Sequence, residues 1–228
     1  MKKIFYILLI FFFNSPVHSH SSDYDGIVRI EMEVFRNNEI IGYSNYFFEH
    51  ENDAMTVKNY TQFKVKLLGS NIFSIDSEAV EKYKKEKLVH FKSTTFQNGK
   101  EKYVNLNYNK PTNKFIIDGS SYKGEADADC LIGSWWNHQI LKANKQISPL
   151  TGSIKDQVVQ LVGNENIILY GKNYNTNHYK LKSKDDNLPK NKKLDFDIWV
   201  SIENNLIVKV AYSRMGNWEY RLKDFKIN

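Results

Sequence analysis

The chain has 228 residues, in which 32 Lys and Arg stand against 26 Asp and Glu, so the formal net charge is +6 at pH 7. A chain of this length can bury one sizeable hydrophobic core. The positive excess is small, and the basic residues, mostly Lys, alternate with acidic ones, which argues against nucleic-acid binding. Cys130 is the one cysteine. It has no disulfide partner within the chain, so the core alone must stabilise the fold.

The first residues follow the order of charge, apolar run and small residues that is typical of a secretory signal peptide. Two lysines precede an unbroken run of ten apolar residues, Ile4–Phe13, and Val17 and Ser19 suit the −3 and −1 positions of a cleavage site. The run is too short to cross a bilayer as a helix, which needs about 20 apolar residues. The sequence therefore predicts a cleavable signal peptide over residues 1–19.

Removal of this segment would leave residues 20–228, with 30 basic side chains (32 less the two leader lysines) against 26 acidic ones, a net charge near +4. No later segment is apolar enough to span a membrane as a helix. We expect a soluble protein in the periplasm of a Gram-negative-type bacterium, or a secreted one. His20 would become the first residue and could chelate copper together with another histidine, although a disordered terminus is the commoner outcome.

Alternation of apolar and polar residues dominates the rest of the chain and predicts β-strands. Period two places one set of side chains on a buried face and the other in water, which is the usual pattern of an antiparallel sheet. The spacing of the runs suggests roughly nine to twelve strands. The clearest alternating runs begin at Val28, Phe63, Phe73, Val104, Leu194, Leu206 and Trp218.

Turn residues separate these runs. Asn98-Gly99 is the strongest turn signal, because both residues tolerate a positive φ. Asn37-Asn38, Asn204-Asn205 and Met215-Gly216 predict further hairpins. Each of these turns is short, as expected of an antiparallel meander.

The alternation stops between Gly119 and Gly152. A short helix is predicted over residues 134–143, with Ser134 as a candidate N-cap. No boundary in the chain requires a second domain. We therefore expect a single, mainly antiparallel all-β domain over residues 20–228, either a large curved sheet or a partly closed barrel.

The most distinctive segment contains two adjacent tryptophans, Trp135 and Trp136, followed by Asn137 and His138. Adjacent tryptophans cannot point the same way on a strand. One interpretation is an aromatic wall of a ligand pocket, in which Asn137 and His138 make polar contacts. These four residues are the candidate ligand-binding site. The alternative is a plug, in which the indole rings close one end of a curved sheet, and large buried tryptophans more often serve that purpose.

Signatures of common enzymes, such as G-x-S-x-G, H-E-x-x-H and C-x-x-C, are absent. An alternative function is a hydrolase of an envelope component, with Cys130 as the nucleophile, His138 as the base and Asp129 beside them. Asp127 and Asp129 would raise the pKa of the thiol, however, so a small buried cysteine is the better interpretation. The sequence favours a non-enzymatic protein with no catalytic residue and no cofactor.

Three acidic residues, Glu125, Asp127 and Asp129, would project to one side of an extended strand and could bind a hard cation such as Ca²⁺. The segment lacks the denser pattern of oxygen ligands that calcium loops have. A solvated acidic loop is the better interpretation, and we predict no metal site.

Short motifs run through most of the chain: Ile41-Gly-Tyr43, Leu88–Gly99, Ser134-Trp-Trp-Asn137, Leu150-Thr-Gly152, His178-Tyr-Lys-Leu181, Asp197-Ile-Trp199 and Leu206-Ile-Val208. In this order they resemble an uncharacterised family of exported bacterial proteins, the domain of unknown function DUF6134. Ser-Trp-Trp-Asn is the most specific element. The chain departs from the pattern at Tyr83, where relatives often have Trp, and at Glu203–Asn205, where a glycine turn is usual. The resemblance implies a large curved antiparallel sheet, somewhat like that of periplasmic lipoprotein carriers, and no activity.

We therefore expect a non-enzymatic periplasmic binding or envelope-associated protein whose concave sheet holds a lipid or another apolar small molecule behind Trp135 and Trp136. The 14 Phe and 14 Tyr would line such an interior. A further alternative is a scaffold that pairs an exposed apolar edge strand with another envelope protein.

Overall fold

The computed structural model describes residue 24 and residues 26–228. The predicted signal peptide and the predicted copper-binding His20 lie outside these residues, so both stay predictions. Within the described residues no helix has the length and apolar character needed to cross a membrane.

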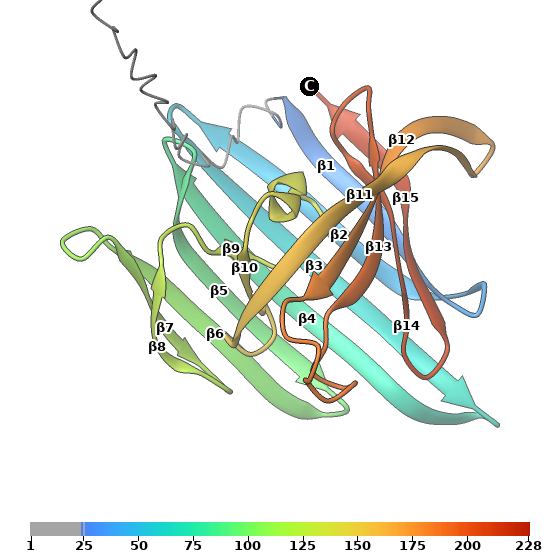
Figure 1. Ribbon diagram of the computed structural model, residues 1–228, viewed down its shortest axis with the longest axis horizontal. Helices are drawn as coiled ribbons and strands as arrows, with labels where there is room; N and C mark the ends of the chain where they lie inside the picture. Colours follow the sequence, from blue (N-terminus) through green and yellow to red (C-terminus); the bar gives the residue numbers. More distant parts are fainter. Residues whose placement is uncertain (1–23, 25) are drawn as a thin grey trace, which may run out of the picture.

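The described chain forms one sheet of fifteen strands and a short 3-10 helix, η2 (Figure 1). The antiparallel all-β prediction is confirmed, although the chain has more strands than expected because several are short or lack clean alternation. The strands are β1 (Ile27–Arg36), β2 (Glu39–Glu51), β3 (Ala54–Leu67), β4 (Ser70–Lys84), β5 (Lys87–Gln97), β6 (Lys100–Asn109), β7 (Lys114–Gly119), β8 (Lys123–Asp127), β9 (Leu131–Ile132), β10 (Lys145–Ile147), β11 (Ile154–Leu169), β12 (Lys172–Ser183), β13 (Asp195–Ser201), β14 (Ile207–Ser213) and β15 (Asn217–Ile227), and η2 spans His138–Leu141.

The strand order is β8-β7-β6-β5-β4-β3-β2-β1-β15-β14-β13-β12-β11-β10-β9. Neighbours pair antiparallel, except for the parallel contact of β9 with β10. The first and last strands, β1 and β15, pair in the middle of this order and join two meanders into one sheet. The edges of the sheet are therefore β8 and β9, which follow each other in the chain.

Tight turns set the register of the long hairpins. Asn37 and Asn38 have φ values of 50° and 66°, and Asn98 and Gly99 have φ values of 51° and 75°. Two consecutive residues with positive φ match the right-handed twist of the strands they connect. The predicted hairpin turns at these positions are confirmed.

The sheet curves so that its inward-facing side chains form the core. On β1, Ile30, Met32 and Val34 are buried, whereas Glu31 and Glu33 between them are not fully buried. The same alternation on β2 to β7 builds a concave apolar face, and the segment from β9 to β10, with η2, lies in front of that face (Figure 1). Bulges in β1, β4 and β11 add twist, which helps the sheet to curve.

The loop between β10 and β11 packs against the first meander. The Ser121 amide donates to the Thr151 carbonyl at 3.0 Å, and the Ser93 hydroxyl donates to the Pro149 carbonyl at 2.5 Å. A Cβ at Gly119 would lie 2.6 Å from the Thr151 oxygen, so only glycine allows this approach. The loop thereby ties the two edges of the sheet together at one end.

The predicted helix is present but shorter than expected, because only His138–Leu141 are helical and the turn is 3-10. The proposed cap at Ser134 is wrong. Asn137 is the N-cap, and its side-chain oxygen accepts from the Gln139 amide at 3.0 Å. Asn137 can do this because its own backbone is extended, as an N-cap requires.

Candidate functional site

Trp136 occupies the centre of the core. Its side chain is only 1% exposed, and its ring meets Tyr24, Phe48 and Tyr83 edge to face, with centroid distances of 4.9, 5.4 and 5.7 Å. Such edge-to-face contacts are favourable between aromatic rings. The position agrees with the plug interpretation, while a ligand contact of this residue stays a prediction.

A buried carboxylate lies under this ring. Glu81 accepts from the Trp136 indole Nε1 at 2.9 Å and from the Tyr83 hydroxyl at 2.5 Å. Burial raises the pKa of Glu81 above its ordinary 4.5, although these hydrogen bonds lower it in part. Glu81 was not among the predicted site residues. The available signal was its alternation with Ala79 and Tyr83, because an acidic residue at an inward position of a strand needs buried partners.

His138 and Asn137 are also buried and bonded within the protein. The His138 amide donates to the Tyr24 hydroxyl at 2.8 Å, and the His138 Nδ1 lies 2.7 Å from the same oxygen. The His138 Nε2 lies 3.1 Å from the Gln139 side-chain nitrogen. A ligand could therefore use these predicted polar contacts only by replacing internal hydrogen bonds.

Trp135 points to another part of the core, as expected of adjacent tryptophans. Its ring packs on Phe196 and Tyr220, with centroid distances of 5.0 and 6.3 Å. Its backbone amide donates to the Tyr46 hydroxyl at 3.3 Å. The four predicted site residues are consecutive in the chain. Trp136 and His138 share Tyr24 as a neighbour, whereas Trp135 contacts a different set of side chains.

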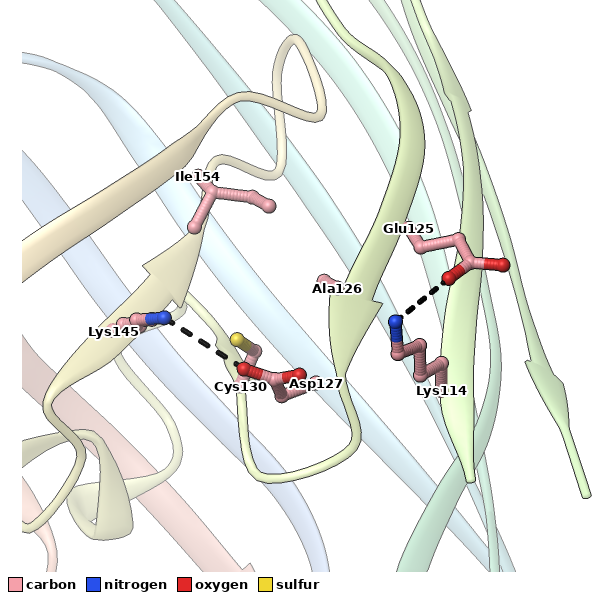
Figure 2. A pocket seen from close by; sticks show the side chains of 7 residues that line it. All are labelled: Lys114, Glu125, Ala126, Asp127, Cys130, Lys145 and Ile154. Atoms are coloured by element: carbon pink, nitrogen blue, oxygen red, sulfur yellow. Dashed lines mark hydrogen bonds and ion pairs between the residues drawn. The ribbon is translucent and has the colours of Figure 1, made fainter. Parts of the chain in front are cut away.

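Cys130 lines a small cleft between β8 and β10, which we call the seam cleft (Figure 2). Its volume is about 100 Å³, and it is lined by Lys114, Glu125, Ala126, Asp127, Cys130, Lys145 and Ile154. Burial, and then the charge of Asp129, raise the pKa of Cys130 to about 11. His138 is not part of this lining, so the geometry does not support the cysteine–histidine hydrolase.

The acidic residues around the seam cleft are paired with lysines. Glu125 lies 2.9 Å from the Lys114 amine, and Asp127 lies 3.7 Å from the Lys145 amine (Figure 2). No group of three or more His, Cys, Asp or Glu side chains in residues 24 and 26–228 is arranged to hold a metal ion.

A second cleft, of about 360 Å³, lies over β12 to β15 and the turn between β1 and β2. Lys180 bridges Asp195 and Asp197 there, at 2.8 and 2.7 Å. Beside it, the His178 ring lies between Glu165 and Asp197 and stacks on Trp199. This cluster was missed because its members come from three strands, and no local pattern brings them together.

One side of β11 has no strand beside it over most of its length. β10 pairs only with Ile154–Asp156, whereas β12 pairs with Gln157–Leu161 and Gly163–Leu169. We call residues 158–168 the open edge. It carries Val158, Leu161, Val162 and Ile168, which are 50, 54, 56 and 73% exposed. In Figure 1, β11 runs across the front of the molecule. Leu169 at its end is buried in the core cluster that includes residues of the first meander.

Fold and surface together define a β-barrel-like, single-sheet protein with a filled interior around Trp136. The chain belongs to the family described as a domain of unknown function (DUF6134), whose sequence profile matches residues 32–223. No protein of curated function matches the chain.

One solved structure agrees on the fold. A β-barrel-like protein of the domain of unknown function DUF1849 from Brucella abortus is 9% identical, with a TM-score of 0.59, over 90% of this chain and 98% of that one. A DUF1329 family protein from Desulfovibrio piger is also 9% identical and covers 93% of this chain and 90% of that one, but its TM-score of 0.26 carries no argument. The first similarity concerns the fold alone.

Proposed function

We propose that the chain is an exported, non-enzymatic protein of the cell envelope that binds an extended strand of another protein along the open edge of β11. The observation that carries this proposal is the absence of a neighbouring strand beside residues 158–168 in the described part of the sheet. An unpaired edge presents a row of backbone donors and acceptors, and an added strand satisfies them by β-augmentation.

The composition of the open edge supports strand docking. Natural proteins protect free edges with lysine, proline or a covering loop. Gln157–Leu169 contains no Lys, Arg or Pro, and it exposes several large apolar side chains instead. The bulge at Val162 is itself a feature that protects free edges, but it leaves the apolar side chains exposed. The four apolar side chains would contact the partner strand next to the backbone hydrogen bonds.

The interior offers less room for binding than the edge. Trp136 is buried against three aromatic rings, and its one polar atom is satisfied by Glu81. At about 100 Å³, the seam cleft is smaller than the roughly 300–1,000 Å³ of typical small-molecule pockets. Because its raised pKa keeps the Cys130 thiol protonated, we do not propose chemistry there.

A photo-crosslinking residue in place of Gln160, which is exposed on β11, tests the docking. In native cells we expect one protein adduct that disappears with Leu161→Lys, because lysine on an edge disfavours strand pairing. Ile116→Lys is the matched control, since Ile116 is 41% exposed on β7, a strand paired on both sides. An adduct that survives Leu161→Lys, or no adduct at all, would refute docking at this edge.

The second candidate is the expected binding of a lipid or another apolar small molecule to the concave sheet. The apolar lining of that face favours it, because the covering segment between β9 and β10 contains only one helical turn. The ligand would have to take the place of Trp136. If this candidate is correct, an apolar molecule stays bound to the purified chain. Measurement of the intact mass under non-denaturing conditions would detect it.

A further inference from the structure

His178 on β12 is held between two carboxylates from the strands on either side. Its Nδ1 lies 2.7 Å from an oxygen of Glu165 on β11, and its Nε2 lies 3.0 Å from an oxygen of Asp197 on β13. The side chain of His178 is only 12% exposed. The three residues therefore connect β11, β12 and β13 through side chains, in addition to the backbone ladder.

An indole and a lysine also lie close to the His178 ring. The Trp199 ring stacks on it with a centroid distance of 4.3 Å and an angle of 11° between the planes, and the Trp199 Nε1 donates to Glu165 at 3.0 Å. Stacking of a cationic ring on an indole is attractive. The Lys209 amine, from β14, lies 4.7 Å from the centroid of the Trp199 ring. Its positive charge partly opposes a positive charge on His178.

The remaining charges near the cluster are already paired. Lys180, two residues along β12, bridges Asp197 and Asp195. Lys209 pairs with Glu219 on β15 at 3.0 Å. Asp197 thus receives one bond from Lys180 and one from His178, while Glu165 receives its bonds from His178 and Trp199.

Only a doubly protonated imidazole can donate to both carboxylates. A neutral ring has one N–H, so one of the two carboxylates would face a nitrogen lone pair. Histidine is also the side chain whose charge commonly changes between about pH 5 and 8. Loss of this proton would therefore break the connection from β12 to either β11 or β13.

We propose that protonation of His178 fixes β11 against β12 and β13, so that the open edge is ordered for strand docking in mild acid and loosened above neutral pH. This inference rests on the proposed function, because it concerns the regulation of the same edge. The Thr176 hydroxyl, which donates to the Glu165 carbonyl at 2.7 Å, keeps part of the contact in either state. The change is therefore a loosening of β11 and not its detachment.

The same hydrogen bonds favour the ionised form of the neighbouring carboxylates. Hydrogen bonds from Trp199 and then His178 lower the pKa of Glu165. Burial alone would raise the pKa of Asp197, but bonds from Lys180 and His178 outweigh it and the pKa is lowered. Both carboxylates therefore stay ionised in mild acid, where they can accept from an imidazolium.

Amide hydrogen exchange of the purified full chain, read by mass spectrometry at pH 5.5 and pH 8 and corrected for intrinsic exchange rates, tests the proposal without any partner. We expect amides of β11 near residues 163–168 to lose a few-fold to roughly tenfold protection at the higher pH, the effect of one charge-assisted hydrogen bond at a half-exposed site. In His178→Gln the protection should be low at both pH values.

His90→Gln is the matched control. The Nδ1 of His90, on β5, lies 2.8 Å from the side-chain oxygen of Asn107, which is a neutral amide and not a carboxylate. It should keep the pH response of β11. Equal protection of wild-type β11 at both pH values, or an unchanged response in His178→Gln, would overturn the inference. Failure of crosslinking at position 160 would instead refute the docking function and leave this exchange result standing.

Discussion

Glu81 is an acidic residue buried in an otherwise largely apolar core. A carboxylate in the middle of aromatic side chains is costly unless donors surround it, and here the Trp136 indole and the Tyr83 hydroxyl both donate to it. The same bonds fix the orientation of Trp136. Glu81 is therefore a positioning residue for the segment that covers the concave face.

The raised pKa of Glu81 has a consequence for stability. Because the folded-state pKa lies above the unfolded value, this group contributes stability that is fully present below about pH 4.5 and is lost as the pH rises through the folded pKa. Glu81→Gln removes that dependence and keeps an oxygen for the indole. We expect Glu81→Gln to be at least as stable as the wild type at pH 7.

Glu81→Ala should behave differently, since it leaves the Trp136 Nε1 without an acceptor and opens a cavity. We expect a loss of about 2–4 kcal/mol in the free energy of unfolding. Urea unfolding at pH 7 measures both variants. A destabilised Glu81→Gln together with a neutral Glu81→Ala would contradict the assigned bonds.

At the level of single residues, the sequence identified the distinctive segment Trp135–His138 but not the residues that contact it. Trp135 to His138 were recognisable because adjacent tryptophans are rare and bulky. Tyr24, which bonds to His138, lies 114 residues away in the chain. No spacing rule connects such positions, so the internal partners of the segment had to come from the structure.

Among the elements, β11 is a long strand that none of the predicted alternating runs covers. Alternation and turn residues located most strands, since period two and a positive φ are local properties. Pairing between distant strands is not local. β11 has an open edge because β10 is only three residues long. A strand of three residues is too short to show a recognisable alternation in the sequence.

The side-chain contacts among β11, β12 and β13 should also weaken in strong acid. The lowered pKa values of Glu165 and Asp197 mean that their contribution is present above the ordinary values of 4.5 and 3.8 and is lost as the pH falls through the folded values. We expect Asp197→Asn to reduce the difference in urea stability between pH 7 and pH 3. Asp224→Asn, which removes an exposed pair with Arg29, is the control and should leave that difference near the wild-type value.

Across the whole molecule, the pairing of β1 with β15 makes one sheet out of two meanders. That sheet encloses a core filled by Trp136 and its aromatic neighbours, and it leaves β11 as a long strand with one unpaired side. The fold class and the antiparallel arrangement were predictable from sequence periodicity. The filling of the interior was not, because aromatic residues on inward faces suit a packed core and a lipid pocket equally well.

The intact mass of the chain, taken from the envelope of its native cells under non-denaturing conditions, tests the central claim most directly. We expect the chain without a bound small molecule, together with a complex of the chain and one other protein. That complex should be lost with Leu161→Lys and kept with Ile116→Lys. A chain that carries an apolar small molecule and no protein partner would contradict binding at the open edge and favour the concave interior.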